Sequence, residues 1–244
     1  DVNDSTSLSH DNIWMCYLDS YQDLWILYND SLLDKMNTTT GEITKYRYDP
    51  NDLSTPSSNR YTYLSVGQTI VPFVEDDFGD LWFSTERAGV NRYVRETDSF
   101  VRYQHTRGDS TSLSRNRVFS ISKGQQGRVY VSTVFGGVNV YDRETDSFSH
   151  ILPASHGLGS SICFYTFEDR KGNLWISHSR GVDVLDRDSG AIRHFQSPVA
   201  RPGPNNFVVP FYEDASGNLL FWAYAGGGFY VMPSDGQQFI SYSR

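Results

Sequence analysis

The stretch Arg95-Glu-Thr-Asp-Ser-Phe100 returns unchanged as Arg143-Glu-Thr-Asp-Ser-Phe148, 48 residues further along the chain. A second hexapeptide, Asp-Ser-Thr-Ser-Leu-Ser, stands both at Asp4–Ser9 and at Asp109–Ser114. Identities of this length in a chain of 244 residues indicate stacked copies of one structural unit, because each unit buries its apolar face against the next. The repeat therefore determines the architecture.

A turn followed by a bulky strand recurs five times. The anchors read Gln22-Asp-Leu-Trp, Gly79-Asp-Leu-Trp, Gly127-Arg-Val-Tyr, Gly172-Asn-Leu-Trp and Gly217-Asn-Leu-Leu, and their first residues are spaced 57, 48, 45 and 45 apart. Nine residues before each anchor stands a small or branched apolar residue: Ile13, Ile70, Val118, Cys163 and Val208. We expect five copies, each with its innermost strand at one of these positions.

Each copy has the pattern of short strands. In the third copy, the runs 118–122, 128–132, 137–141 and 147–151 are rich in β-branched and aromatic residues. The segments between them have hairpin length and contain Gly, Asp or Gln at turn positions. No segment has a sustained helical period. Four antiparallel strands in about 45 residues are typical of a β-propeller blade.

We therefore predict an all-β chain that is a single β-propeller region over residues 1–244. The blades are expected at approximately 8–49, 66–104, 113–152, 160–196 and 206–244. An open array of five blades would leave the faces of the first and last blades unburied, which is costly in a repeat protein without capping units. We expect the chain to be part of a larger ring, with a closed five-bladed ring as the alternative.

Composition limits the possible partners. The net charge is −8 and no Lys/Arg cluster occurs along the sequence, which argues against nucleic acid and against contact with an anionic membrane surface. No apolar run of about 18 residues is present to span a bilayer. The cysteines Cys16 and Cys163 are expected to pack as small hydrophobic residues rather than to form a disulfide.

The anchors and the turns that follow them closely resemble the two-component regulator propeller repeat. The resemblance is carried by Glu168-Asp-Arg-Lys-Gly-Asn-Leu-Trp-Ile with Arg180-Gly-Val-Asp-Val-Leu-Asp-Arg, and by Glu75-Asp-Asp-Phe-Gly-Asp-Leu-Trp-Phe with Ala88-Gly-Val-Asn-Arg-Tyr. It extends over essentially the whole chain. Blade one departs from the pattern at Gln22 and blade five at Leu220, which replaces the Trp.

The resemblance implies the sensor region of a hybrid two-component histidine kinase of Bacteroidetes. In that family two seven-bladed propellers precede an immunoglobulin-like domain, a membrane helix and a kinase. The implied role is a non-catalytic, periplasmic sensor domain of an inner-membrane receptor that responds to a glycan-derived oligosaccharide. The resemblance also implies a homodimer through the full periplasmic region, and no cofactor.

Residues that are identical between copies are expected to be scaffold. Trp25, Trp82 and Trp175 share one repeat position and are predicted to be wedges between adjacent blades. The repeated hexapeptide is predicted to be the hairpin between the third and outer strands, with Phe100 and Phe148 packed into the sheets. Function is expected where the copies differ.

The copies differ in the loops between the second and third strands and in the linkers between blades, which emerge on one face. Aromatic rings stack on the apolar faces of sugars, and Arg, Asn and His bond their hydroxyl groups. An ordinary solvated loop is the alternative for each single residue. The candidate ligand-binding residues are Tyr28, Arg60, Tyr61, Arg87, Arg115, Arg117, Phe135, His178, Arg180, Asn206 and Tyr224.

Catalytic patterns are weak. Ser120-Ile-Ser-Lys123 falls on a predicted strand without the helix that this motif needs, and Gly226–Gly228 lacks the setting of a phosphate loop. The six histidines have no metal-ligand spacing, so no catalytic residue and no metal site is predicted. Abundant acidic residues leave open a glycan-active lyase or glycosidase, and a structural protein-interaction propeller is the other alternative.

Overall fold

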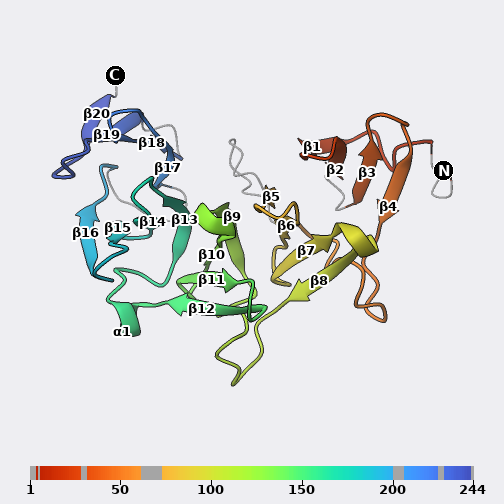
Figure 1. Ribbon diagram of the computed structural model, residues 1–244, viewed down its shortest axis with the longest axis horizontal. Coiled ribbons are helices and arrows are strands. Elements are labelled where there is room, and N and C mark those ends of the chain that lie inside the picture. The colour runs from red at the N-terminus through yellow and green to blue at the C-terminus, as the bar shows by residue number, and fades with distance from the viewer. Residues whose placement is uncertain are drawn as a thin grey trace.

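The computed structural model describes residues 4, 6–28, 32–61, 73–199, 206–224 and 228–242. Within these residues, the strands form five four-stranded antiparallel sheets in which strands adjacent in sequence are also adjacent in space. The sheets stand around an arc, with the first strand of each toward the centre and the fourth outside (Figure 1). The predicted all-β architecture of five four-stranded blades is confirmed.

Each blade takes four consecutive strands. Blade one contains β1 (Ile13–Leu18), β2 (Asp23–Tyr28), β3 (Leu33–Asn37) and β4 (Ile43–Tyr46). Blade two contains β5 (Phe73–Glu75), β6 (Leu81–Ser84), β7 (Val90–Val94) and β8 (Ser99–Tyr103). Blade three contains β9 (Val118–Lys123), β10 (Val129–Thr133), β11 (Val138–Asp142) and β12 (Ser147–Ile151).

The last two blades and the short helical turns complete the described chain. Blade four contains β13 (Cys163–Glu168), β14 (Leu174–His178), β15 (Gly181–Leu185) and β16 (Ile192–Gln196). Blade five contains β17 (Val208–Glu213), β18 (Leu219–Ala223), β19 (Phe229–Met232) and β20 (Ile240–Tyr242). The helical turns are η1 (Arg95–Thr97), η2 (Gln125–Gly127) and α1 (Pro153–His156).

The predicted start of the innermost strand agrees with the structure in four blades. Ile13, Val118, Cys163 and Val208 are the first residues of β1, β9, β13 and β17. Ile70, the fifth predicted start, lies outside the described residues. In these four blades the register between first and second strands shifts by a β-bulge, which increases the local twist.

The repeated tryptophans are wedges between blades, as predicted. The Trp25 ring is fully buried and meets Tyr93 of blade two edge-on, with 4.7 Å between ring centroids. Trp82 meets Tyr141 of blade three in the same way at 4.5 Å. Edge-to-face contact between large rings adds to the stabilisation from burying their area. Trp175 packs similarly against Phe221 of blade five, at 5.9 Å.

The repeated hexapeptide is a hairpin that also joins neighbouring blades. Arg95 donates to the Asp19 carboxylate of blade one at 2.5 Å, and Arg143 donates to Asp76 of blade two at 3.1 Å. The same carboxylates accept the indole N–H of Trp25 and Trp82, at 2.8 and 2.9 Å. One buried aspartate therefore holds the wedge of its own blade and the hairpin of the next.

The aspartate within the hexapeptide makes a second inter-blade contact. Asp98 and Asp146 adopt left-handed backbone conformations, with φ of 48° and 49°, which short polar side chains tolerate best. Asp98 accepts hydroxyl hydrogen bonds from Tyr93 of its own blade and from Tyr46 of blade one. Asp146 does the same for Tyr141 and for a tyrosine of blade two, Tyr103.

A polar residue at one repeat position of the third strand ties the incoming linker to its blade. Its side-chain oxygen accepts a linker backbone N–H that would otherwise be unpaired close to the core. The pairs are Asp34 with Ser9 at 2.8 Å, Asn91 with Ser57 at 2.7 Å, Asn139 with Ser114 at 2.7 Å and Asp183 with Gly159 at 2.6 Å.

The two ends of the arc leave apolar sheet surface exposed. β18 and β19 alternate buried and half-exposed residues, and the more exposed face of blade five carries only apolar side chains: Leu220, Trp222, Phe229, Val231, Ile240 and Tyr242. On blade one, Leu18 is 51% exposed and Cys16 is also exposed. Both cysteines are free, as expected, and Cys163 is buried. The prediction that Cys16 packs in the interior is wrong, because no described blade covers its side of β1.

Candidate functional site

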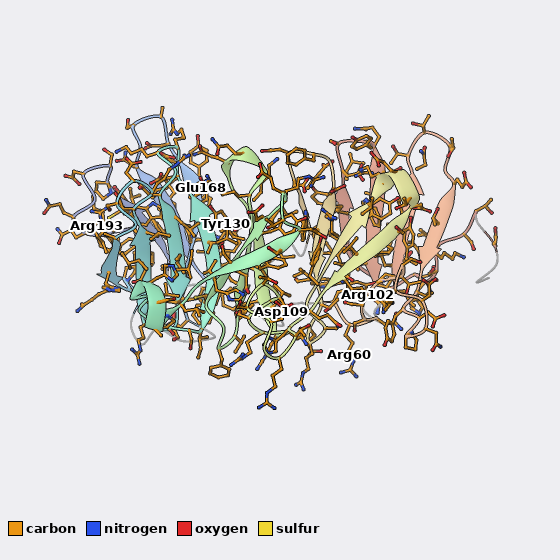
Figure 2. All side chains as sticks on the ribbon, turned by 60° about the horizontal axis from the view of Figure 1, so that its bottom comes forward. Arg60, Arg102, Asp109, Tyr130, Glu168 and Arg193 are labelled. Atoms are coloured by element: carbon orange, nitrogen blue, oxygen red, sulfur yellow. The ribbon has the colours of Figure 1, made fainter. Side chains whose placement is uncertain are left out.

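The blades present two different faces. The hairpin face is formed by the turns between first and second and between third and fourth strands. The loop face is formed by the linkers between blades and by the loops between second and third strands. In Figure 2, Arg60 of a linker and Glu168 at the end of β13 lie at opposite faces. The predicted ligand-binding residues belong to the loop face or to the strand ends beneath it.

Backbone hydrogen bonds connect the loop face into one continuous strip across blades two, three and four. Each bond joins a loop of one blade to the linker beside it, so successive loops and linkers have fixed positions relative to one another. The bonds run from Glu86 N to Arg60 O, Gly89 N to Asn116 O, Val134 N to Arg117 O, Gly137 N to Ser161 O and Ser179 N to Ile162 O, at 2.9 to 3.1 Å.

Four of the predicted site residues are buried beneath this face. Tyr61 packs against Phe83, with 5.6 Å between ring centroids, and Tyr224 stacks on Phe207 at 4.6 Å. Tyr28 and His178 occupy one repeat position at the end of the second strand and lie 2% and 3% exposed. These side chains support the loops from below. Asn206 is half-buried at the start of blade five.

Tyr28 and His178 each face a buried aspartate. The Tyr28 hydroxyl donates to Asp34 at 2.7 Å, and burial together with this bond raises the pKa of Tyr28. The Nε2 atom of His178 lies 3.0 Å from Asp183 Oδ1, and its Nδ1 accepts the Arg180 backbone N–H. Both ring nitrogens of His178 are therefore directed to protein groups. His178 holds the loop in place and does not face a ligand.

Two N–H donors and the His178 ring surround Asp183. It accepts the Gly159 N–H at 2.6 Å and Nδ1 of the more exposed His194 at 2.7 Å, and Nε2 of His178 lies 3.0 Å away. Burial alone would raise the pKa of Asp183, but the hydrogen bonds from its neighbours outweigh burial and hold the pKa below its ordinary value. Asp183 is therefore ionised at neutral pH and anchors the loops of blade four.

The remaining predicted residues are exposed. Arg60 and Arg87 have side chains 78% and 79% exposed, and both approach one carboxylate, that of Glu86, at 3.9 and 3.6 Å. The Arg115 guanidinium donates to the Ser114 carbonyl and that of Arg180 to the Gly159 carbonyl. The arginine strip, defined as Arg60, Arg87, Arg115, Arg117 and Arg180, follows the line of loop and linker contacts.

Phe135 is the exposed aromatic residue of the predicted set. Its ring is 61% exposed, and its backbone φ of 68° lies in the left-handed region, where a bulky side chain is strained. The ring borders a cavity of about 380 Å³ over blade three, which is lined also by Arg115, His105, His150 and Asp109. The structure thus brings Phe135 and Arg115 to one cavity, as a sugar site requires.

Sequence reasoning missed His105 and His150, which lie in a linker and at the outer strand β12. Both rings bond backbone carbonyls: His105 bonds Leu113 at 2.7 Å and His150 bonds Ser112 at 2.8 Å. Their spacing along the chain carries no motif, and only the folded linker places them beside Phe135. Among the described residues, no group of three His, Cys, Asp or Glu side chains is placed to hold a metal ion.

The fold and the loop face define the class of this protein as a β-propeller with its variable residues on one face. No protein-family model matches the sequence, and no curated protein matches it by sequence. No helix in the described part of the chain is long and apolar enough to cross a membrane.

Solved structures with the same fold include extracellular domains of hybrid two-component systems. The extracellular domain of the hybrid two-component system BT3049 from B. thetaiotaomicron superposes with a TM-score of 0.72 and 24% identity, over 96% of this chain and 31% of that one. For BT4673 of the same organism the TM-score is 0.70 at 19% identity, again over 96% and 31%. Virginiamycin B lyase from Staphylococcus aureus gives 0.65 at 14% identity, over 99% and 71%.

These similarities confirm at the level of the fold the predicted resemblance to propeller sensor regions of hybrid two-component systems. Because one fold hosts many functions, a similarity with sequence identity below about 25% establishes a shared fold and not a shared function. The chain spans about a third of the length of those two extracellular domains.

Proposed function

We propose that this chain is a ligand-recognition propeller in the extracytoplasmic, periplasmic part of a hybrid two-component histidine kinase receptor, and that it binds a glycan-derived oligosaccharide on its loop face. The observation that carries the proposal is the cavity beside Phe135. There an exposed, strained aromatic ring stands next to an arginine and two histidines, on the face where the blades differ.

A sugar suits this site for a chemical reason. Pyranose rings have apolar C–H faces that stack on an aromatic ring, and hydroxyl groups that need donors and acceptors at the rim. Phe135 offers the stacking surface, and Arg115 and Asp109 offer a donor and an acceptor at the same cavity. Because the histidines are already directed to backbone carbonyls, we assign the site a binding role without catalysis.

The proposed receptor also explains the ends of the arc. The apolar faces of blades one and five match the kind of surface that blades two to four bury against each other. We propose that further blades of the same repeat cover them in a seven-bladed ring. Signal transmission is then proposed to require homodimerisation of the complete extracytoplasmic region, because a binding event changes how two receptor halves are arranged only when both are present.

Titration calorimetry against a panel of neutral and acidic oligosaccharides tests the binding role. We expect at least one member to bind, and Phe135→Ala to weaken that binding about tenfold, the effect of losing one well-stacked aromatic contact of roughly 1–1.5 kcal/mol. Phe78→Ala is the matched control, because Phe78 is 57% exposed on the hairpin face. If no glycan of the panel binds, the proposed oligosaccharide-binding role is wrong.

A further inference from the structure

Five exposed arginines lie along the loop face of a chain whose net charge is −8. The arginine strip contributes five guanidinium groups, and Glu86 is the one carboxylate that any of them contacts among the described residues. Arg60 and Arg87 share that single group. Arg115 and Arg180 bond only carbonyl oxygens within the part of the chain that the structure describes. For Arg117, no side-chain partner is found there.

The arginines of the hairpin face provide the contrast. Arg95 meets Asp19, Arg143 meets Asp76 and Asp80, and Arg128 meets Glu168, with N···O distances of 2.5 to 3.1 Å. There the guanidinium groups are satisfied within the protein and serve packing between strands and blades. On the loop face they are left pointing at solvent, so their charge is available to something outside the chain.

The strip is contiguous, so one ligand can contact several of its arginines. Backbone bonds join the loop that carries Arg87 to the linker that carries Arg115 and Arg117. Gly136 keeps the next loop pressed against that linker, because a Cβ atom there would lie 2.9 Å from Cγ of Arg115 and even closer to the Ser114 hydroxyl. Arg115 and Phe135 consequently border the same cavity.

We propose that the oligosaccharide recognised here carries carboxylate or sulfate groups, an inference that rests on the proposed sugar-binding function. The planar guanidinium fork matches the two oxygens of such groups and binds them through paired, charge-assisted hydrogen bonds. Phe135 stacks on the apolar face of the sugar ring while Arg115 or Arg117 binds the acidic group at its edge. The anionic groups of further sugar units meet Arg87 on one side and Arg180 on the other.

Matched pairs of probes separate charge from sugar identity. A galacturonic acid hexasaccharide is compared with its fully methyl-esterified form, and a chondroitin sulfate hexasaccharide with its desulfated, carboxyl-esterified form. Calorimetry on the full chain is run at 0.1 M and at 1 M NaCl, where the screening length falls from about 10 Å to about 3 Å. We expect a charged member to bind at least tenfold more tightly than its neutral partner, with the difference shrinking at 1 M NaCl.

Variants assign the effect to the strip. Arg115→Gln and Arg117→Gln are each expected to weaken binding of the charged probe about tenfold, the usual effect of losing a hydrogen bond between charged groups. Arg117→Lys should restore part of the loss. Arg193→Gln is the control, since Arg193 lies on the outer strand β16, away from the loop face (Figure 2). Circular dichroism confirms that each variant is folded.

Three outcomes overturn the inference. If a neutral glycan binds as tightly as its charged partner and without dependence on salt, acidic groups are not recognised. The inference then fails, and the proposed sugar-binding function is retained. If Arg193→Gln weakens binding of the charged probe as much as Arg117→Gln does, the probe binds by nonspecific electrostatic attraction and not at the arginine strip. If no probe and no member of the neutral and acidic panel binds, the inference and the proposed function fail together.

Discussion

At the scale of single residues, one buried aspartate joins two neighbouring blades. Asp76 accepts the backbone N–H groups of Phe78 and Asp80, the indole N–H of Trp82 and a guanidinium N–H of Arg143. Asp19 has the same role in blade one. These aspartates stand six residues before the tryptophan, and sequence reasoning passed over them in favour of the repeated hexapeptide.

Asp76→Ala is expected to lower the free energy of unfolding by about 3 kcal/mol, because it leaves a guanidinium and several N–H groups without their buried acceptor. Asp76→Asn keeps an acceptor for the turn and should cost less. Glu96→Ala, which removes an exposed carboxylate from the same face, should change stability by less than about 0.5 kcal/mol. Urea unfolding measures all three, and equal effects of Asp76→Ala and Glu96→Ala would contradict the inter-blade role.

Phe135 is expected to lower the stability of the fold while contributing to oligosaccharide binding. Phe135→Gly relieves the left-handed backbone of a bulky residue, which costs about 1–3 kcal/mol, and adds the flexibility of glycine, about 0.5–1 kcal/mol. The variant should therefore be more stable by about 1 kcal/mol and bind oligosaccharide about tenfold more weakly. Gln126→Gly, with φ of 59° on the hairpin face, should gain stability with binding unchanged. Thermal unfolding and calorimetry on both variants test this, and unchanged binding in Phe135→Gly would count against the site.

At the scale of strands and loops, two positions change together in blades one to four. Where Thr85 directly follows the second strand or Thr133 ends it, the third strand carries Asn91 or Asn139. Where it ends in Tyr28 or His178, the third strand carries Asp34 or Asp183 instead. A carboxylate has more acceptor sites than an amide oxygen, so burying one requires the additional hydroxyl or imidazole donor.

Asp183 should make stability depend on pH. Its folded-state pKa is lowered, so its contribution is complete above the unfolded value of about 3.9 and is lost as the pH falls through the folded pKa. The facing groups are His178, His194 and the thiol of Cys163, whose pKa is raised by burial. Asp183→Asn should flatten the decline of unfolding free energy below about pH 4.

Asp188→Asn is the control for this titration, because it removes an equal charge from an exposed turn of the same blade. Urea unfolding at several pH values measures both variants. The same acid decline in wild type and Asp183→Asn would show that the cluster around Asp183 does not titrate on unfolding.

At the scale of the whole molecule, the open arc predicts self-association. Phe229 and Tyr242, with 5.9 Å between ring centroids, form part of the apolar face at the end of blade five. Exposed apolar surface of this kind favours contact with other chains. The chain should sediment as concentration-dependent oligomers, and Phe229→Thr with Tyr242→Thr should reduce them.

Leu53→Thr, which changes a residue 73% exposed in a linker, should leave this self-association unaltered. Addition of two further blades to the chain should abolish it by covering both ends. A wild-type chain that stays monomeric at its highest soluble concentration would argue that the ends need no cover.

Much of this architecture follows from local pattern. The phase of the repeat predicted five blades, the starts of their inner strands and the tryptophan wedges, because each depends on residues close together in the chain. The candidate site was less predictable. Tyr28, Tyr61 and Tyr224 are residue types that suit a sugar site, but all three are buried in the core. Tyr28 ends β2, Tyr61 forms a β-bridge with Thr85, and Tyr224 directly follows β18.

The repeated hexapeptide was enough to show that the chain is built of stacked blades. Each copy makes its contacts within one blade and its neighbour, so the repeat alone predicts how the blades stack. The distribution of charge was not visible in that pattern. No cluster of arginines exists along the sequence, yet folding aligns one or two from each of three blades on a single face while the hairpin arginines find carboxylates. Charges act through distance in space, so their balance became apparent once the blades were in place.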